Sequence, residues 1–134
     1  MIAGTLYASE LAETFLRIGM ADRARERIKK ALDFAKSTGH CVYASELYRI
    51  DGMTWLPSDA ARAEECFQQA IEMARKQEAR SLELRAAMSL ARFRASLGKP
   101  REAYAALSPV YSWFTEGFDT SDLLQAKNLL EELS

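Results

Sequence analysis

The residues of this sequence that could do chemistry begin with His40 and Cys41, whose adjacency suggests a nucleophile beside its base. His40 is the only histidine, so a metal site built on two histidines is excluded. A catalytic thiol also needs a base within hydrogen-bond reach and a third group that orients the base. Adjacent residues at a helix start usually point apart, and no orienting group is near in sequence. We interpret His40 as a turn residue and Cys41 as a packed thiol.

Two further motifs have a chemical form. Gly98-Lys99-Pro100 is similar to the end of a phosphate-binding loop, but that loop needs glycine where Phe93 stands and serine or threonine where Pro100 stands. The acid pairs Glu64-Glu65 and Glu131-Glu132 fall mostly on exposed helical faces, where solvated charge is the ordinary role. The sequence therefore predicts a protein that is not an enzyme, with no catalytic residue, no metal ligand and no cofactor.

Composition and charge narrow the class of partner. The 134 residues suffice for one domain with a core, and 18 basic residues face 19 acidic ones. Such a balance gives no basic footprint for nucleic acid or for a membrane surface. No apolar run approaches the roughly 20 residues of a membrane helix, and the start lacks the pattern of a signal peptide. Cys41 and Cys66 are expected as reduced thiols in a cytoplasmic protein, with an oxidised pair as the alternative.

Helices must position any site in this chain. Their composition dominates, and we find no alternating apolar and polar run typical of strands. Turn residues recur at Gly19, Gly39, Pro57-Ser58, Gly98-Lys99-Pro100 and Gly117. The predicted helices span about 5–18, 22–37, 42–56, 59–77, 81–97, 100–108 with a short piece over 110–114, and 120–133.

Three residues inside or beside these helices carry particular expectations. Ser58 is expected to cap the fourth helix, with Asp59 in its favourable first turn. Pro109 should bend or interrupt the sixth helix because it has no N–H to donate. Gly52 lies inside the third helix, where a glycine is tolerated if a neighbouring helix approaches closely.

A small–large–small pattern repeats along the chain. Ala63, Phe67 and Ala70 stand at i, i+4 and i+7, on one face of a helix. The pattern also occurs at Ala24, Ile28 and Ala31, and less faithfully at Ala103, Leu107 and Val110. The first residues of the three sets are 39 and 40 residues apart, which indicates an internal repeat. Other positions expected to be buried are Leu11, Phe15, Ile18, Ala35, Ala44, Leu47, Ile50, Trp55, Leu84, Ala87, Leu90, Ala91, Leu97, Leu123, Ala126, Leu130 and Leu133.

The fold class that follows is all-α, and we expect residues 1–134 to form a single domain. It would be a right-handed α-α superhelix of three helical hairpins, at about 5–38, 41–77 and 80–115, closed by a capping helix at about 120–133. Each hairpin has an apolar stripe too broad to be buried internally, so neighbouring hairpins must stack.

The hairpins resemble tetratricopeptide repeats. That family places a small, a large apolar and a small residue along the second helix of each unit, as in Ala63, Phe67 and Ala70. Leu11, Ala12 and Phe15 look like the leucine, small residue and aromatic of a first helix. The sequence departs from the family at Arg94, where an aromatic is expected, and its repeats are longer than the usual 34 residues.

A narrower resemblance covers the chain from about residue 44 onward. The stretches 46–52 and, most specifically, 109–120 are similar to the C-terminal tail of large bacterial proteins that join an adenylate or guanylate cyclase domain to an ATPase domain. This resemblance implies a regulatory role in signalling, without catalytic residues, since none of the catalytic motifs has a counterpart here.

The first helices of stacked repeats line a concave groove that binds a protein or peptide partner. The residues predicted near that groove are Ser9, Glu13, Arg49, Arg85, Met88 and Arg92. Three arginines would favour carboxylates or phosphates on the partner; the alternative is that they are solvated or paired with local glutamates. A second hypothesis is a homodimer formed through the uncapped N-terminal face, near Leu6, Tyr7 and Leu11. The aromatic residues of 111–118 are expected to wedge the last helix onto the third hairpin.

Overall fold

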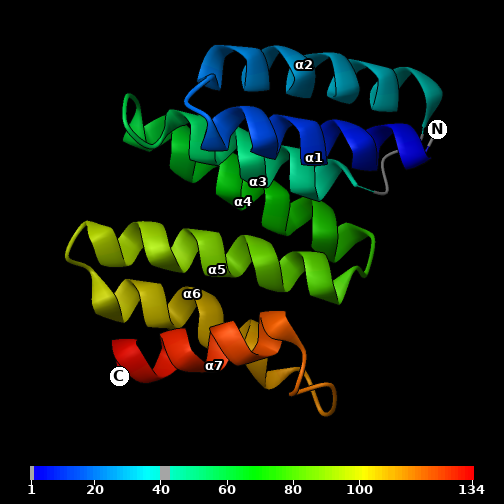
Figure 1. Ribbon diagram of the computed structural model, residues 1–134. Coiled ribbons are helices and arrows are strands. Elements are labelled where there is room, and N and C mark those ends of the chain that lie inside the picture. The colour runs from blue at the N-terminus through cyan, green and yellow to red at the C-terminus, as the bar shows by residue number, and fades with distance from the viewer. Residues whose placement is uncertain (1, 40–42) are drawn as a thin grey trace.

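The computed structural model describes residues 2–39 and 43–134, with side chains from residue 10 onward. Its described part is all-helical, which confirms the predicted fold class. Figure 1 shows the helices stacked from α1 and α2 at the top to α6 and α7 at the bottom. The helices are α1 (Ile2–Arg17), α2 (Ala21–Thr38), α3 (Ala44–Trp55), α4 (Ala60–Lys76), α5 (Arg80–Ser96), α6 (Pro100–Ser112) and α7 (Ser121–Leu133).

The packing of the helices repeats with a step of two. The pairs α1–α2, α3–α4 and α5–α6 pack together, and each pair continues into the next through α2–α3, α4–α5 and α6–α7. The odd-numbered helices also contact one another, as α1–α3, α3–α5 and α5–α7. α7 therefore packs on α5 and α6 in the same way as α5 packs on α3 and α4. The odd-numbered helices thus share one side of the stack.

The small–large–small pattern forms the buried spine of α2, α4 and α6. Ala63, Phe67 and Ala70 are all 0% exposed, and the corresponding residues of α2 and α6 are also buried. The spine residues of α4 and α6 belong to one core cluster with α5 and α7, whereas those of α2 pack with α1 and α3. The interpretation of these positions as the packing centre of each hairpin is confirmed.

Gly52 is required by the closeness of α3 and α4. A Cβ atom added at Gly52 would lie 2.7 Å from Cε1 of Phe67 and 3.1 Å from the carbonyl oxygen of Ala63. Contacts under 3.0 Å are essentially absent from real Cβ atoms, so a larger residue would displace the ring. This confirms the expectation that a neighbouring helix approaches closely at Gly52.

Three helix ends share one turn geometry, although only two of them contain glycine. In each turn an N–H group donates to the carbonyl five residues earlier: Met20 to Phe15, Ala79 to Ala74 and Lys99 to Arg94. This bond defines the Schellman motif, whose turning residue is left-handed. Gly19 and Gly98 have φ near 80°, as glycine allows, and Glu78 takes the same role with φ 55°. The end of α4 thus lacked the usual sequence signal.

Two residues expected in the core are exposed. Ile18 is 62% exposed and Leu97 is 49% exposed. Both stand directly before the glycine of a Schellman turn, after α1 has ended at Arg17 and α5 at Ser96. The helical periodicity that predicted their burial no longer applies beyond the helix end, so both predictions were wrong.

The boundaries around two prolines also differ from expectation. Asp59, not Ser58, caps α4, and its carboxylate accepts a hydrogen bond from the N–H of Arg62 at 3.1 Å. α6 continues through Pro109 to Ser112 without interruption. Pro109 leaves the carbonyl of Ala105 without its helical donor, but both residues are exposed, so water can hydrate that carbonyl.

The apolar face of α7 lies slightly differently from the prediction. Leu123 and Ala126 are buried as expected, but the third buried position is Leu129. Leu130 and Leu133 are only partly buried and pack at the edge of the core. Trp55, also expected to be buried, is half-buried at the end of α3, and its indole N–H is buried without an acceptor.

Candidate functional site

A row of ion pairs crosses four odd-numbered helices and includes three of the residues predicted for the groove. From α1, the Oε2 atom of Glu13 lies 3.6 Å from Nη2 of Arg49 on α3. Arg49 donates to both carboxylate oxygens of Glu46, at 3.0 Å and 3.1 Å. Glu46 continues to Arg85 on α5, at 3.4 Å, and Arg85 to Asp122 on α7, at 2.9 Å. We call these five residues the ion-pair row.

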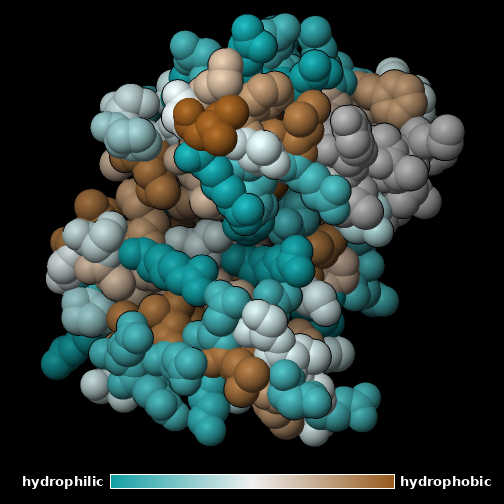
Figure 2. Space-filling view, in the orientation of Figure 1, coloured by the Kyte–Doolittle hydropathy of each residue, from teal (hydrophilic) through white to brown (hydrophobic). Residues whose placement is uncertain are grey.

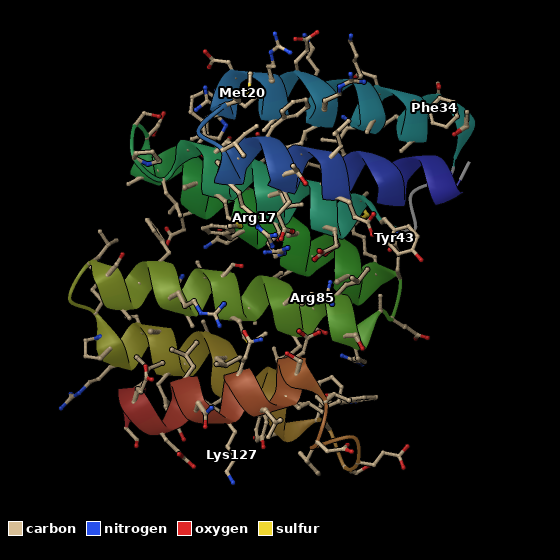
Figure 3. The ribbon with its side chains drawn as sticks, viewed as in Figure 1. Arg17, Met20, Phe34, Tyr43, Arg85 and Lys127 are labelled. Atoms are coloured by element: carbon tan, nitrogen blue, oxygen red, sulfur yellow. The ribbon has the colours of Figure 1, made fainter. Side chains whose placement is uncertain are left out.

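The ion-pair row is partly withdrawn from solvent. The side chains of Glu46 and Arg49 are 7% and 14% exposed. Arg85, labelled on α5 in Figure 3, is more open, and its hydrogen bond to Asp122 together with the charge of Glu46 raises its pKa above the ordinary arginine value. Arg49 and Arg85 therefore have local carboxylate partners, which was the alternative left open for the groove arginines.

An apolar hollow of about 360 Å³ lies beside this row, between α3 and α5. Met53, Phe67 and Phe93 form its apolar part, and the exposed side chains of Leu56 and Leu97 stand at its edge. Figure 2, in the orientation of Figure 1, shows brown apolar groups exposed among the teal hydrophilic side chains on this view of the molecule. We call this apolar hollow the α3–α5 hollow. Its volume is in the range of small-ligand and side-chain pockets.

Arg92 is the groove arginine whose charge remains available. It lies at the α3–α5 hollow and is exposed. Its Nη2 atom donates to the Oε1 atom of Gln125 at 3.2 Å, and among the residues that the structure describes no carboxylate lies at ion-pair distance from it. An apolar hollow with an uncompensated guanidinium at its edge can bind an apolar side chain that has a carboxylate nearby.

The two remaining groove residues do not join this arrangement. Met88 is only 3% exposed and belongs to the core cluster. Arg85, Ser89 and Arg92 follow one row of α5 at i, i+4 and i+7, and Met88 lies to one side of that row, turned toward the core. The side chain of Ser9, in α1, lies outside the described residues, as do those of Leu6 and Tyr7. Leu11, the third residue named for the homodimer hypothesis, is described and is partly buried.

Sequence reasoning missed Glu46 and Asp122. Glu46 stands three residues before Arg49, a spacing at which helical side chains meet, so a pairing rule could have found it. Asp122 is 37 positions from Arg85, and nothing in the sequence links the two. Long-range pairs of this kind depend on how α7 packs on α5.

The aromatic segment before α7 is divided between core and surface. Tyr111 and Phe114 are partly buried against the core, as the wedge interpretation requires. Trp113 and Phe118 are 54% and 44% exposed. The guanidinium of Arg80 lies 4.7 Å from the ring centre of Trp113, so a cation covers part of the exposed indole.

The motifs that were considered for catalysis or phosphate binding have ordinary structural roles wherever the structure describes them. Gly98 and Lys99 form the turn between α5 and α6, Pro100 begins α6, and Glu64 pairs with Arg94 at 3.2 Å. His40 and Cys41 lie outside the described residues. Within the described ranges, no cluster of histidine, cysteine and acidic residues could hold a metal ion. The same ranges contain no helix with the length and apolar character of a membrane span.

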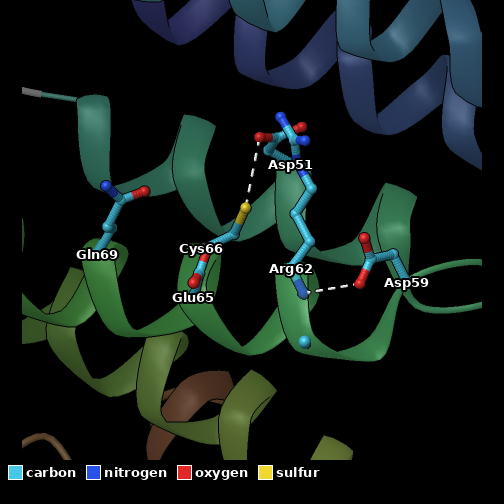
Figure 4. A pocket seen from close by; sticks show the side chains of 7 residues that line it. Asp51, Asp59, Arg62, Glu65, Cys66 and Gln69 are labelled. Carbon is cyan, nitrogen blue, oxygen red and sulfur yellow. Dashed lines mark hydrogen bonds between the residues drawn. The ribbon is translucent and has the colours of Figure 1, made fainter.

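Cys66 is a free, buried thiol that donates a hydrogen bond to Asp51 across 3.5 Å (Figure 4). Burial, followed by the charge and hydrogen bond of Asp51, raises the pKa of Cys66 to about 12. At pH 8 roughly one thiol in 10⁴ is then ionised. Because the thiolate is the nucleophile, the folded protein should be nearly inert at this position.

Alkylation of a Cys41→Ser variant tests that inference. We expect iodoacetamide to label Cys66 at least about 1000-fold more slowly in the folded chain than in urea, because about 1000-fold less thiolate is present below pH 9. The folded-state rate should keep rising with pH beyond 9. A plateau near pH 9, measured by mass spectrometry, would show an ordinary thiol and contradict the buried contact with Asp51.

A comparison of the chain with protein-family models finds no match, and a comparison with curated proteins finds no significant one. The resemblances to tetratricopeptide repeats and to the tail of cyclase–ATPase proteins therefore stay predictions.

Proposed function

We propose that this chain is a non-catalytic protein-binding module, and that the side formed by its odd-numbered helices binds a segment of a partner protein. The tetratricopeptide-like repeat and the regulatory tail of a signalling protein belong to the same proposal. The observation that supports it most is the α3–α5 hollow with Arg92 at its edge. Binding there would depend on shape and charge and would need no bond chemistry.

The expected partner segment carries a large apolar side chain and, close to it, a carboxylate. The apolar side chain would pack against the exposed side chains of Leu56 and Leu97, which removes apolar surface of both from water. The carboxylate would pair with Arg92 without first displacing an internal acid. Arg49 is already held by Glu46 and Glu13, so it would shape the edge of the hollow and add little net charge.

A selection of random peptides against the intact chain tests this proposal. We expect the enriched peptides to combine an apolar residue with Asp or Glu within about four positions, one helical turn. Arg92→Glu should weaken their binding at least tenfold, which corresponds to about 1.4 kcal/mol. Arg101→Glu is the matched control, because Arg101 is an exposed arginine of α6 away from the hollow.

The choice of Arg92 avoids a confounding loss of stability. Arg85→Glu would place a third carboxylate beside Glu46 and Asp122 and strain the ion-pair row. The helical circular dichroism of Arg92→Glu should equal that of the parent chain. Peptides that bind Arg92→Glu and Arg101→Glu equally well would count against the α3–α5 hollow as the binding site.

A further inference from the structure

A second depression lies between α2 and α4, on a different face of α3 from the α3–α5 hollow. It measures about 520 Å³, and we call it the α2–α4 trough. Lys29 and Lys36 of α2 form one wall, and Arg62 and Gln69 of α4 form the other. Trp55 of α3 also lines it. Its volume is that of a typical site for a small organic molecule.

The trough has more positive than negative charge. Four cationic side chains line it, against the two carboxylates of Asp33 and Asp51. Arg25 is already used, because it donates to the hydroxyl and carbonyl oxygens of Thr54 and pairs with Asp22 outside the trough. Among the described residues, no carboxylate lies at ion-pair distance from the other three cations, Lys29, Lys36 and Arg62. The walls therefore offer three positive charges for an anionic group.

The arginines of the trough lie on an aromatic ring. The guanidinium carbon of Arg25 is 3.8 Å from the ring centre of Trp55, and that of Arg62 is 4.5 Å from it. Cation–π attraction at such distances holds the planar groups in place without neutralising their charge. Arg62 is thus positioned in advance and can still pair with an anion.

The carboxylate of Asp51 adds a requirement for a donor. Among the described residues, its hydrogen-bond partner is the thiol of Cys66, a weak donor, at 3.5 Å. Figure 4 shows Asp51 and Arg62 together at the smaller hollow that adjoins the trough and shares both residues with it. A bare inorganic anion would meet repulsion from Asp51, whereas a ligand that also carries an ammonium group would satisfy this carboxylate.

We propose that the α2–α4 trough binds a small organic anion that carries a phosphate or carboxylate group together with an amino group. The anionic group pairs with Lys29, Lys36 and Arg62, and the amino group lies toward Asp51. This site is separate from the surface proposed for partner proteins, and either site can exist without the other.

Fluorescence titration of a Trp113→Phe variant tests this site. The sequence has two tryptophans, so Trp55 becomes the single reporter, and the exposed Trp113 can be replaced with little effect on packing. The probes are O-phosphoserine, glutamate and inorganic phosphate. We expect saturable changes of Trp55 emission with at least one amino-bearing probe, binding at least tenfold more tightly than inorganic phosphate. Whichever of O-phosphoserine and glutamate binds more tightly identifies phosphate or carboxylate as the anionic group.

Charge-matched variants separate a built site from general attraction. Lys29→Ala with Lys36→Ala should weaken binding at least tenfold. Arg27→Ala with Lys30→Ala removes the same charge from exposed residues of the same helix that do not line the trough, and should change binding less than twofold. The proposal is overturned if neither amino-bearing probe saturates, if inorganic phosphate binds as tightly, or if both double variants weaken binding equally.

Discussion

Phe67→Ala should lower the free energy of unfolding by about 3–5 kcal/mol, the range measured for large-to-small changes at fully buried aromatic positions. Phe67 is 0% exposed, and its ring centre lies 6.0 Å from that of Phe93 on α5. It therefore joins α4 to both α3 and α5. Urea unfolding followed by circular dichroism measures the loss.

Phe34→Ala is the matched control for this change. The same ring is removed from α2, but Phe34 is 47% exposed, so the expected loss is below about 1 kcal/mol. Losses of similar size at the two positions would mean that Phe67 does not fill the centre of the middle hairpin.

A double-mutant cycle with Gly52→Ala identifies the contact that Phe67 makes. In the parent chain, the new methyl group meets the Phe67 ring, and this overpacking opposes the roughly 1 kcal/mol that alanine gains over glycine in a helix. Without the ring, the tight contact with the carbonyl oxygen of Ala63 at 3.1 Å remains, but the clash with the ring is gone. Gly52→Ala should therefore be less destabilising in the Phe67→Ala variant than in the parent chain, and additive effects would contradict the close approach of α3 and α4.

The sequence was most informative where one local rule decides the structure. The spacing of Ala63, Phe67 and Ala70 predicted a buried helical face, and this face is buried in all three hairpins. Glycine marked the ends of α1, α2 and α5, because only glycine adopts the left-handed conformation without strain. These features depend on a few neighbouring residues, so they can be inferred without tertiary contacts.

The errors arose where tertiary context or a competing rule prevailed. α6 continues through Pro109, which was expected to bend or interrupt it, because the carbonyl group left without a donor belongs to an exposed residue. Ile18 and Leu97 satisfied the helical period but stood beyond the helix ends. Each case required knowledge of where the helix ended or what surrounded it.

The candidate site was only partly accessible from the sequence. Register placed Arg85 and Arg92 on one side of α5, but it could not show that Arg85 pairs with Asp122 of α7 and that Arg92, among the described residues, has no carboxylate at ion-pair distance. Register also placed Met88 in the groove, but Met88 lies on the neighbouring flank of α5, and its side chain packs in the core. The α2–α4 trough could not be predicted from the sequence, because its charged residues come from three helices.

The second large effect is expected at Glu46, the central carboxylate of the ion-pair row. Glu46→Gln should lower the free energy of unfolding by about 2–3 kcal/mol, since hydrogen bonds to charged groups contribute about 1.5–3 kcal/mol each and Gln keeps part of the contact. Arg49 is 14% exposed and would keep at most one of its two hydrogen bonds to residue 46, and among the described residues Glu13, at 3.6 Å, would be its remaining carboxylate partner. A guanidinium this deeply placed cannot regain full hydration.

Glu83→Gln separates this mechanism from the burial of a carboxylate as such. The side chain of Glu83 is 4% exposed, slightly less than that of Glu46, and it too pairs with two arginines. Those arginines, Arg75 and Arg80, are 60% and 39% exposed, so water can hydrate them once the charge is removed. We expect a loss of about 1 kcal/mol or less, as for exposed ion pairs. Equal losses in the two variants, measured by urea unfolding, would show that burial of the acid matters and that exposure of its arginine partners does not.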